Sequence, residues 1–93
     1  MLVQFSELRC KEVINVADGA RLGYVNDLEL EQERGQVLAL LVPTPGRLFG
    51  LLGSTGDYVI PWPCIRRIGG DIILVDVCLA ECRRDRVRKG WLR

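Results

Sequence analysis

Four cysteines are the residues of this 93-residue chain with the clearest chemical potential, because a thiolate can bind a metal or act as a nucleophile. Cys78 and Cys82 are four residues apart and would share one face of a helix. A zinc site needs three or four ligands in a tetrahedral array, so Cys10 and Cys64 would have to complete it. The spacing differs from paired Cys-x-x-Cys motifs and favours ordinary buried or half-exposed thiols. We therefore expect no metal and no cofactor.

Catalytic chemistry is restricted further because the chain contains no histidine. This excludes histidine-ligated metals and every mechanism that needs an imidazole acid or base. The carboxylates of Asp27, Glu29 and Glu31 alternate along the chain, a pattern that favours a solvated strand face over a catalytic pair. A loop over residues 43–57 contains four glycines but lacks the Gly-Lys-Ser/Thr ending of a phosphate-binding loop. We expect a protein that is not an enzyme.

The same loop carries large apolar side chains that could bind a partner. It is a fifteen-residue connection, longer than most. Its side chains either fold back to cap the core or form an exposed contact surface for a protein or a second copy. A tryptophan held between two prolines has the same two interpretations and leans toward core packing. The candidate partner-binding residues are Leu48, Phe49, Leu51, Leu52 and Trp62.

Charge is divided unevenly along the chain, although the net charge is only +1. Residues 83–93 hold six basic residues and one acidic residue, whereas residues 1–82 hold seven basic and eleven acidic ones. Basic side chains in such a tail can neutralise nucleic-acid phosphates or bind an acidic partner. A solvated tail that aids solubility is the favoured alternative. The candidate residues are Arg83, Arg84, Arg86, Arg88 and Lys89.

Short β-branched and apolar runs predict the elements that position these residues. Residues 13–16 and 22–25 flank Asp18-Gly19, a dipeptide typical of a tight hairpin turn. Over residues 22–31 the apolar side chains of Leu22, Tyr24, Leu28 and Leu30 fall on even positions, and the acidic ones of Asp27, Glu29 and Glu31 fall on odd positions. This period of two predicts one long, bent strand.

Further runs predict strands over 37–42, 58–60, 65–68 and 72–77, the last two joined as a hairpin by a Gly-Gly-Asp turn. Six short strands favour a small closed antiparallel barrel, because closure removes exposed edges. The residues expected to be largely buried are Val37, Leu38, Leu40, Leu41, Ile60, Ile72 and Leu74.

Composition is consistent with one soluble folded domain: 48% of residues are hydrophobic and 27% are charged. The first residues lack the basic start and long apolar stretch of a signal peptide. The longest apolar run, residues 37–43, is far shorter than a membrane span. We expect a cytoplasmic protein with no transmembrane segment and reduced thiols.

Several segments, in this order and spacing, resemble PRC-barrel domains. The opening segments are residues 5–15 (FSELRCKEVIN), 18–23 (DGARLG) and 27–30 (DLEL). Residues 46–53 (GRLFGLLG), 59–62 (VIPW) and 65–75 (IRRIGGDIILV) are similar, more narrowly, to the YlmC/YmxH family of spore-forming bacteria. The chain departs from the pattern at Cys10, where glycine is expected, and in its basic tail.

This resemblance implies a six-stranded PRC-type barrel over residues 1–77. A short basic tail over residues 78–93 follows it, and a helix is one conformation open to this tail. It also implies a link to sporulation, no catalytic activity and a role in docking or assembly. We therefore expect a non-enzymatic protein-interaction module that binds another protein or itself as a homodimer. The alternative is a ribosome- or nucleic-acid-associated accessory factor that uses the basic tail.

Overall fold

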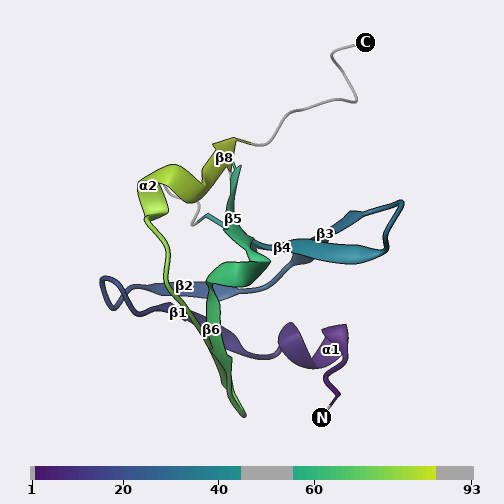
Figure 1. Cartoon of the computed structure of the whole chain (residues 1–93). Coiled ribbons are helices and arrows are strands. Elements are labelled where there is room, and N and C mark those ends of the chain that lie inside the picture. The colour runs from purple at the N-terminus through teal and green to yellow at the C-terminus, as the bar shows by residue number, and fades with distance from the viewer. Residues whose placement is uncertain (1, 45–55, 86–93) are drawn as a thin grey trace, which may run out of the picture.

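The computed structural model of the chain describes residues 2–44 and 56–85, and these residues form two four-stranded sheets with three short helical segments (Figure 1). The first sheet has the strand order β2 (Arg21–Tyr24), β1 (Glu12–Asn15), β7 (Ile72–Val75), β6 (Ile65–Ile68). The second has the order β3 (Asp27–Glu31), β4 (Gln36–Pro43), β5 (Gly56–Pro61), β8 (Arg83–Asp85). The helical segments are α1 (Phe5–Leu8), the 3-10 turn η2 (Trp62–Cys64) and α2 (Leu79–Cys82).

Both predicted hairpins are confirmed. Strands β1 and β2 pair antiparallel, and Gly19 in their connection has a φ of 74°, which a glycine adopts without strain. The Asp18 carboxylate accepts a hydrogen bond from the Ala20 amide (2.9 Å) and stabilises this turn. Strands β6 and β7 also pair antiparallel, and the Gly69 amide donates to the Ile72 carbonyl (2.8 Å) across their connection.

The closed six-stranded antiparallel barrel is wrong for the described residues. They form eight strands, neither sheet closes on itself, and β1 pairs with β7 in parallel. The predicted strand over 22–31 is divided because the chain changes sheets at Val25, which is buried, and Asn26, whose amide donates to the Leu41 carbonyl (2.8 Å). Strand β8 is an addition from the predicted tail, where a helix (α2) and a strand follow one another.

The core lies between the two sheets and contains the fully buried side chains Leu40, Ile60, Ile73, Val13, Val42 and Val75. Burial is confirmed for Leu40 and Ile60. In β7 the alternation is reversed relative to the prediction: Ile73 and Val75 face the core, and Ile72 and Leu74 are half-buried. Val37 and Leu41 are also half-buried, and Leu38 is exposed.

Two sets of long-range hydrogen bonds join the segment around β1 to residues about sixty positions later in the chain. The buried Asn15 side chain donates to the Val77 carbonyl (3.0 Å) and accepts from the Val77 amide (3.1 Å). It therefore ties the segment that leads to α2 onto the end of β1. The Lys11 ammonium donates to the carbonyls of Gly69 and Gly70, both at 2.7 Å, and holds the β6–β7 turn.

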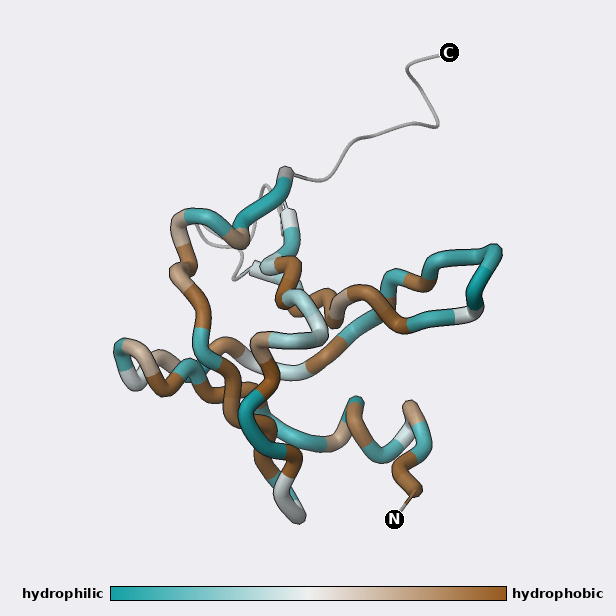
Figure 2. Tube along the Cα trace, viewed as in Figure 1, coloured by the Kyte–Doolittle hydropathy of each residue, from teal (hydrophilic) through white to brown (hydrophobic). Residues whose placement is uncertain are grey.

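The β3–β4 hairpin projects away from the rest of the fold (Figure 1). Its tip is hydrophilic, whereas hydrophobic segments gather where the strands of the two sheets meet (Figure 2). Among the residues described, no helix is long and apolar enough to cross a membrane.

Candidate protein-binding surface

An apolar depression lies at the junction of β4 and η2. Its lining combines one large aromatic side chain with aliphatic neighbours, and apolar surface predominates. The exposed fractions are 47% for Leu38 and 39% for Trp62, high values for large hydrophobic residues. We call this surface, formed by Val37, Leu38, Trp62 and Pro63 with Gln36 at its rim, the Trp62 patch.

A β-bulge explains why Leu38 is exposed although the run around it predicted a buried strand. Glu29 of β3 is opposite Ala39 of β4, but the next residue, Leu30, is opposite Val37. Leu38 is therefore the extra residue of β4, and it lies outside the regular alternation. The bulge places Leu38 on the surface in the part of β4 that extends beyond the core.

Prolines explain why Trp62 stays at the surface, where the preference for core packing proved wrong. Pro61 ends β5 opposite Ala39, so the next residues, Trp62 and Leu38, are neighbours. Pro61 and Pro63 have restricted φ angles, and the Trp62 carbonyl accepts the Ile65 amide that closes η2. The indole is thus carried by a short, stiff backbone segment. A stiff support lowers the conformational entropy lost when a partner binds.

Acidic side chains are concentrated on the β3–β4 hairpin, whose strand β4 also carries Val37 and Leu38 of the Trp62 patch. Residues 27–36 contain four carboxylates, those of Asp27, Glu29, Glu31 and Glu33, against the single guanidinium of Arg34. The Glu29 carboxylate forms an ion pair with Arg84 of β8. The Glu31 carboxylate accepts the backbone amide of Arg34 (3.0 Å) and stabilises the hairpin turn. The apolar Trp62 patch thus lies partly on a strand that pairs with the acidic strand β3.

Two of the five predicted basic candidates lie among the residues that the structure describes. Arg83 and Arg84 lie on β8, where Arg84 is engaged by Glu29. This ion pair offsets one of the charges expected to face a phosphate backbone. The remaining basic candidates, Arg86, Arg88 and Lys89, lie outside the described residues, as do the loop candidates Leu48, Phe49, Leu51 and Leu52. Trp62 is the predicted partner-binding residue whose surroundings the structure describes.

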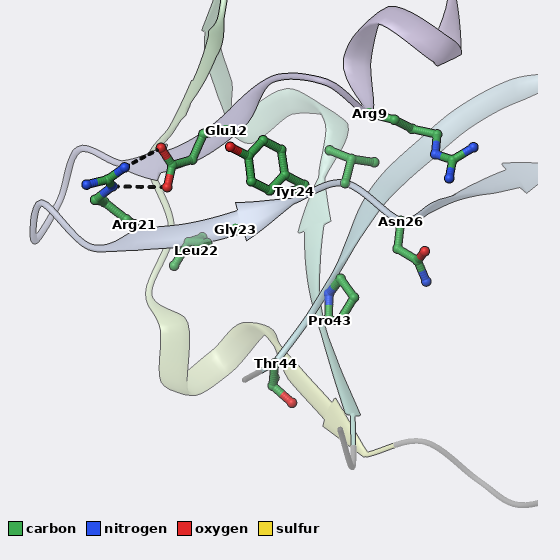
Figure 3. A pocket seen from close by; sticks show the side chains of 10 residues that line it. Arg9, Glu12, Arg21, Leu22, Gly23, Tyr24, Asn26, Pro43 and Thr44 are labelled. Carbon is green, nitrogen blue, oxygen red and sulfur yellow. Dashed lines mark hydrogen bonds and ion pairs between the residues drawn. The ribbon is translucent and has the colours of Figure 1, made fainter. Parts of the chain in front are cut away.

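A second depression, with a mixed polar and apolar lining, opens beside β2 (Figure 3). The Arg21 guanidinium donates to both carboxylate oxygens of Glu12, from Nε at 3.0 Å and from Nη2 at 2.8 Å. This hydrogen bonding lowers the pKa of Glu12, so the carboxylate stays ionised. Tyr24 and Arg9 also line the opening, which is wide and exposed to solvent. The ion pair is a surface contact, and an ionised Glu12 carboxylate cannot act as a general acid at neutral pH.

The four cysteines are free thiols that differ in their exposure to solvent. Cys10 and Cys78 are exposed, and Cys64 and Cys82 are half-buried against the core. Burial, with a smaller electrostatic effect from Cys64 and Cys78, raises the pKa of the Cys82 thiol and so lowers its reactivity. Within residues 2–44 and 56–85, no three or more cysteine and acidic side chains are arranged to hold a metal ion. The expectation that the protein binds no metal stays a prediction.

The sequence of the chain matches that of a known family of small domains. The profile of the PRC-barrel domain matches residues 2–78, and the chain therefore belongs to the PRC-barrel family. It is 35% identical over 74 residues to a probable sporulation protein, YlmC of Bacillus subtilis, covering 80% of this chain and 91% of that protein.

Further relatives agree with this assignment. The chain is 40% identical over 77 residues to the uncharacterised YmxH of Bacillus subtilis, covering 81% of this chain and 89% of the relative. It is 32% identical over 69 residues to an uncharacterised protein of Clostridium acetobutylicum, covering 74% and 78%. The predicted resemblance to the YlmC/YmxH group is confirmed.

Proposed function

We propose that this PRC-barrel protein is a non-enzymatic docking module that binds a partner protein through the Trp62 patch. The observation that carries the proposal is the pair formed by Leu38 and Trp62, two exposed apolar side chains lining one depression. Aromatic anchors beside aliphatic residues are typical of the centres of protein interfaces. The bulge and the two prolines hold this pair at the surface, where it gains free energy when a partner covers it.

The relatives support a cellular setting for this activity. One of them is named as a probable sporulation protein, and we propose that the partner is present in sporulating cells. We further propose that the protein acts in the cytoplasm. The proposal includes self-association as a homodimer, in which the partner is a second copy of the chain.

The nucleic-acid alternative rests on the net charge of the last eleven residues. Because Arg84 is engaged by Glu29, the described part of that segment lends it little support. It is tested alongside the docking proposal by including nuclease.

The test is an affinity purification of the tagged full-length protein from sporulating cells, with and without nuclease. The variants are Trp62→Ala and Leu38→Ser, and the matched control is Leu2→Ser, which alters an exposed leucine outside the patch. We expect a protein that co-purifies in stoichiometric amount with the wild type and the control, survives nuclease and is lost from both patch variants. Loss of every partner on nuclease treatment, or equal recovery by all variants, would overturn the proposal.

A further inference from the structure

Strand β3 is an open edge of the second sheet. It is the outermost strand of the order β3-β4-β5-β8, and no other described strand lies along its outer side. The Leu28 amide donates to the neighbouring Asp27 carboxylate (2.8 Å). An outermost strand directs every second backbone amide and carbonyl away from its neighbour. The edge therefore offers backbone groups to which an added strand could pair.

The two faces of β3 differ in chemistry. Asp27, Glu29 and Glu31 alternate with Leu28 and Leu30, so the carboxylates share one face and the leucines share the other. The bulge leaves this alternation intact, because the extra residue belongs to β4. Leu28 packs against the core, whereas Leu30 is 60% exposed. An added strand would thus meet negative charge on one face and an uncovered leucine on the other.

Charge selects the kind of strand that fits. Antiparallel pairing of β3 with β3 of a second copy would place carboxylates opposite or diagonal to one another, which is destabilising. Because Glu29 is already paired with Arg84, a strand with alternating basic and apolar residues would place its basic side chains beside Asp27 and Glu31 and its apolar ones beside Leu30.

We propose that β3 accepts, by antiparallel β-strand addition, an extended partner segment in which basic and apolar residues alternate. This inference rests on the proposed function and identifies the chemistry of the partner. Leu30 is opposite Val37 of the Trp62 patch, so the apolar face of the added strand would extend that patch across the sheet. Main-chain pairing then supplies affinity, and the alternating side chains supply specificity.

The probe is a synthetic seven-residue peptide of alternating lysine and valine with capped ends and a fluorescent label. Its binding to the full chain is followed by fluorescence anisotropy, and its location by amide chemical shifts in NMR spectra. Two control peptides replace lysine by glutamate or carry N-methyl groups on alternate backbone amides. We expect binding of the basic peptide with shifts centred on residues 27–31, no binding of the acidic peptide, and at least tenfold weaker binding of the N-methylated peptide.

Protein variants separate a specific edge from a general attraction to acidic surface. Glu31→Gln removes a charge from β3 while keeping an oxygen that can accept the Arg34 amide. Glu33→Gln is the matched control, because it removes a charge from the exposed hairpin turn outside β3. We expect Glu31→Gln to weaken peptide binding about two- to fivefold, as loss of a cross-strand ion pair does, and Glu33→Gln to weaken it less than twofold.

Three outcomes would overturn the inference: N-methylation leaves affinity unchanged, both glutamine variants weaken binding equally, or the shifts centre on residues outside β3. These outcomes leave the Trp62 patch untouched, because cellular partner capture by wild type and its loss in Trp62→Ala are measured separately. Conversely, loss of the docking proposal with an intact peptide response would show that the edge binds strands without serving the cellular partner.

Discussion

Replacing Asn15 by alanine is expected to destabilise the protein strongly, although the substitution removes only a small side chain. Asn15 is fully buried, and its amide pairs with both backbone groups of Val77, which is itself buried. Alanine leaves the Val77 amide and carbonyl without these partners inside the core. An unsatisfied buried polar group costs roughly 1 to 3 kcal/mol, so two of them predict a loss of about 2 to 6 kcal/mol.

The assay is urea unfolding followed by circular dichroism, with Asn26→Ala as the control. The control alters an exposed asparagine and is expected to change the free energy of unfolding by less than about 0.5 kcal/mol. The thermal midpoint of Asn15→Ala should fall by about 8 °C or more, since a domain of this size loses about 4 to 8 °C per kcal/mol.

Hydrogen exchange tests the mechanism behind this loss. If Asn15 holds the segment leading to α2, exchange in Asn15→Ala should rise most at residues 76–85, more than in the β4 and β5 core. A loss of stability below about 0.5 kcal/mol, or an even rise in exchange across the chain, would refute the reasoning.

Three further predictions follow from the core, the thiols and the loop. Leu40→Ala should lower the free energy of unfolding in urea by about 2 to 5 kcal/mol, because Leu40 is fully buried between the sheets. A loss as small as that of a surface substitution would contradict this placement. Purified protein should contain no stoichiometric zinc by elemental analysis, and chelators should leave its thermal midpoint unchanged. If residues 43–57 mediate a homodimer, Phe49→Asp should give a folded monomer with an unchanged melting point. Lost stability at an unchanged hydrodynamic size would instead mean that Phe49 packs inward. Sedimentation of the wild-type protein as a monomer at high micromolar concentration would refute the dimer.

Local signals predicted the local structure well. The Asp18-Gly19 and Gly-Gly-Asp turns identified both hairpins, because turn residues and the flanking runs determine a hairpin within a short stretch of chain. The parallel pairing of β1 with β7 was missed because it joins segments about sixty residues apart, and alternation within a strand does not reveal its partner. The change of sheet at Val25 was missed although the alternation is interrupted there, since Val25 follows the aromatic Tyr24 and the polar Asn26 precedes Asp27.

The candidate site was predicted only in part, for physical reasons. Trp62 was identified from its two prolines, but its exposure depends on where β5 ends opposite Ala39. Leu38 was assigned to the core because an apolar run carries no signal for a bulge, which arises from the register with β3. The buried Asn15 contact was not predicted, although a polar residue inside an apolar strand is a signal that indicates such a contact.

The central claim is that the Trp62 patch binds a protein, and the most direct measurement is the affinity of the co-purified partner for wild-type and Trp62→Ala protein. Calorimetric titration of both, after circular dichroism has shown equal folding, gives the two dissociation constants. An aromatic anchor at an interface centre contributes 2 kcal/mol or more, which predicts a dissociation constant at least about 30-fold higher for Trp62→Ala. Equal dissociation constants for two equally folded proteins would contradict the claim.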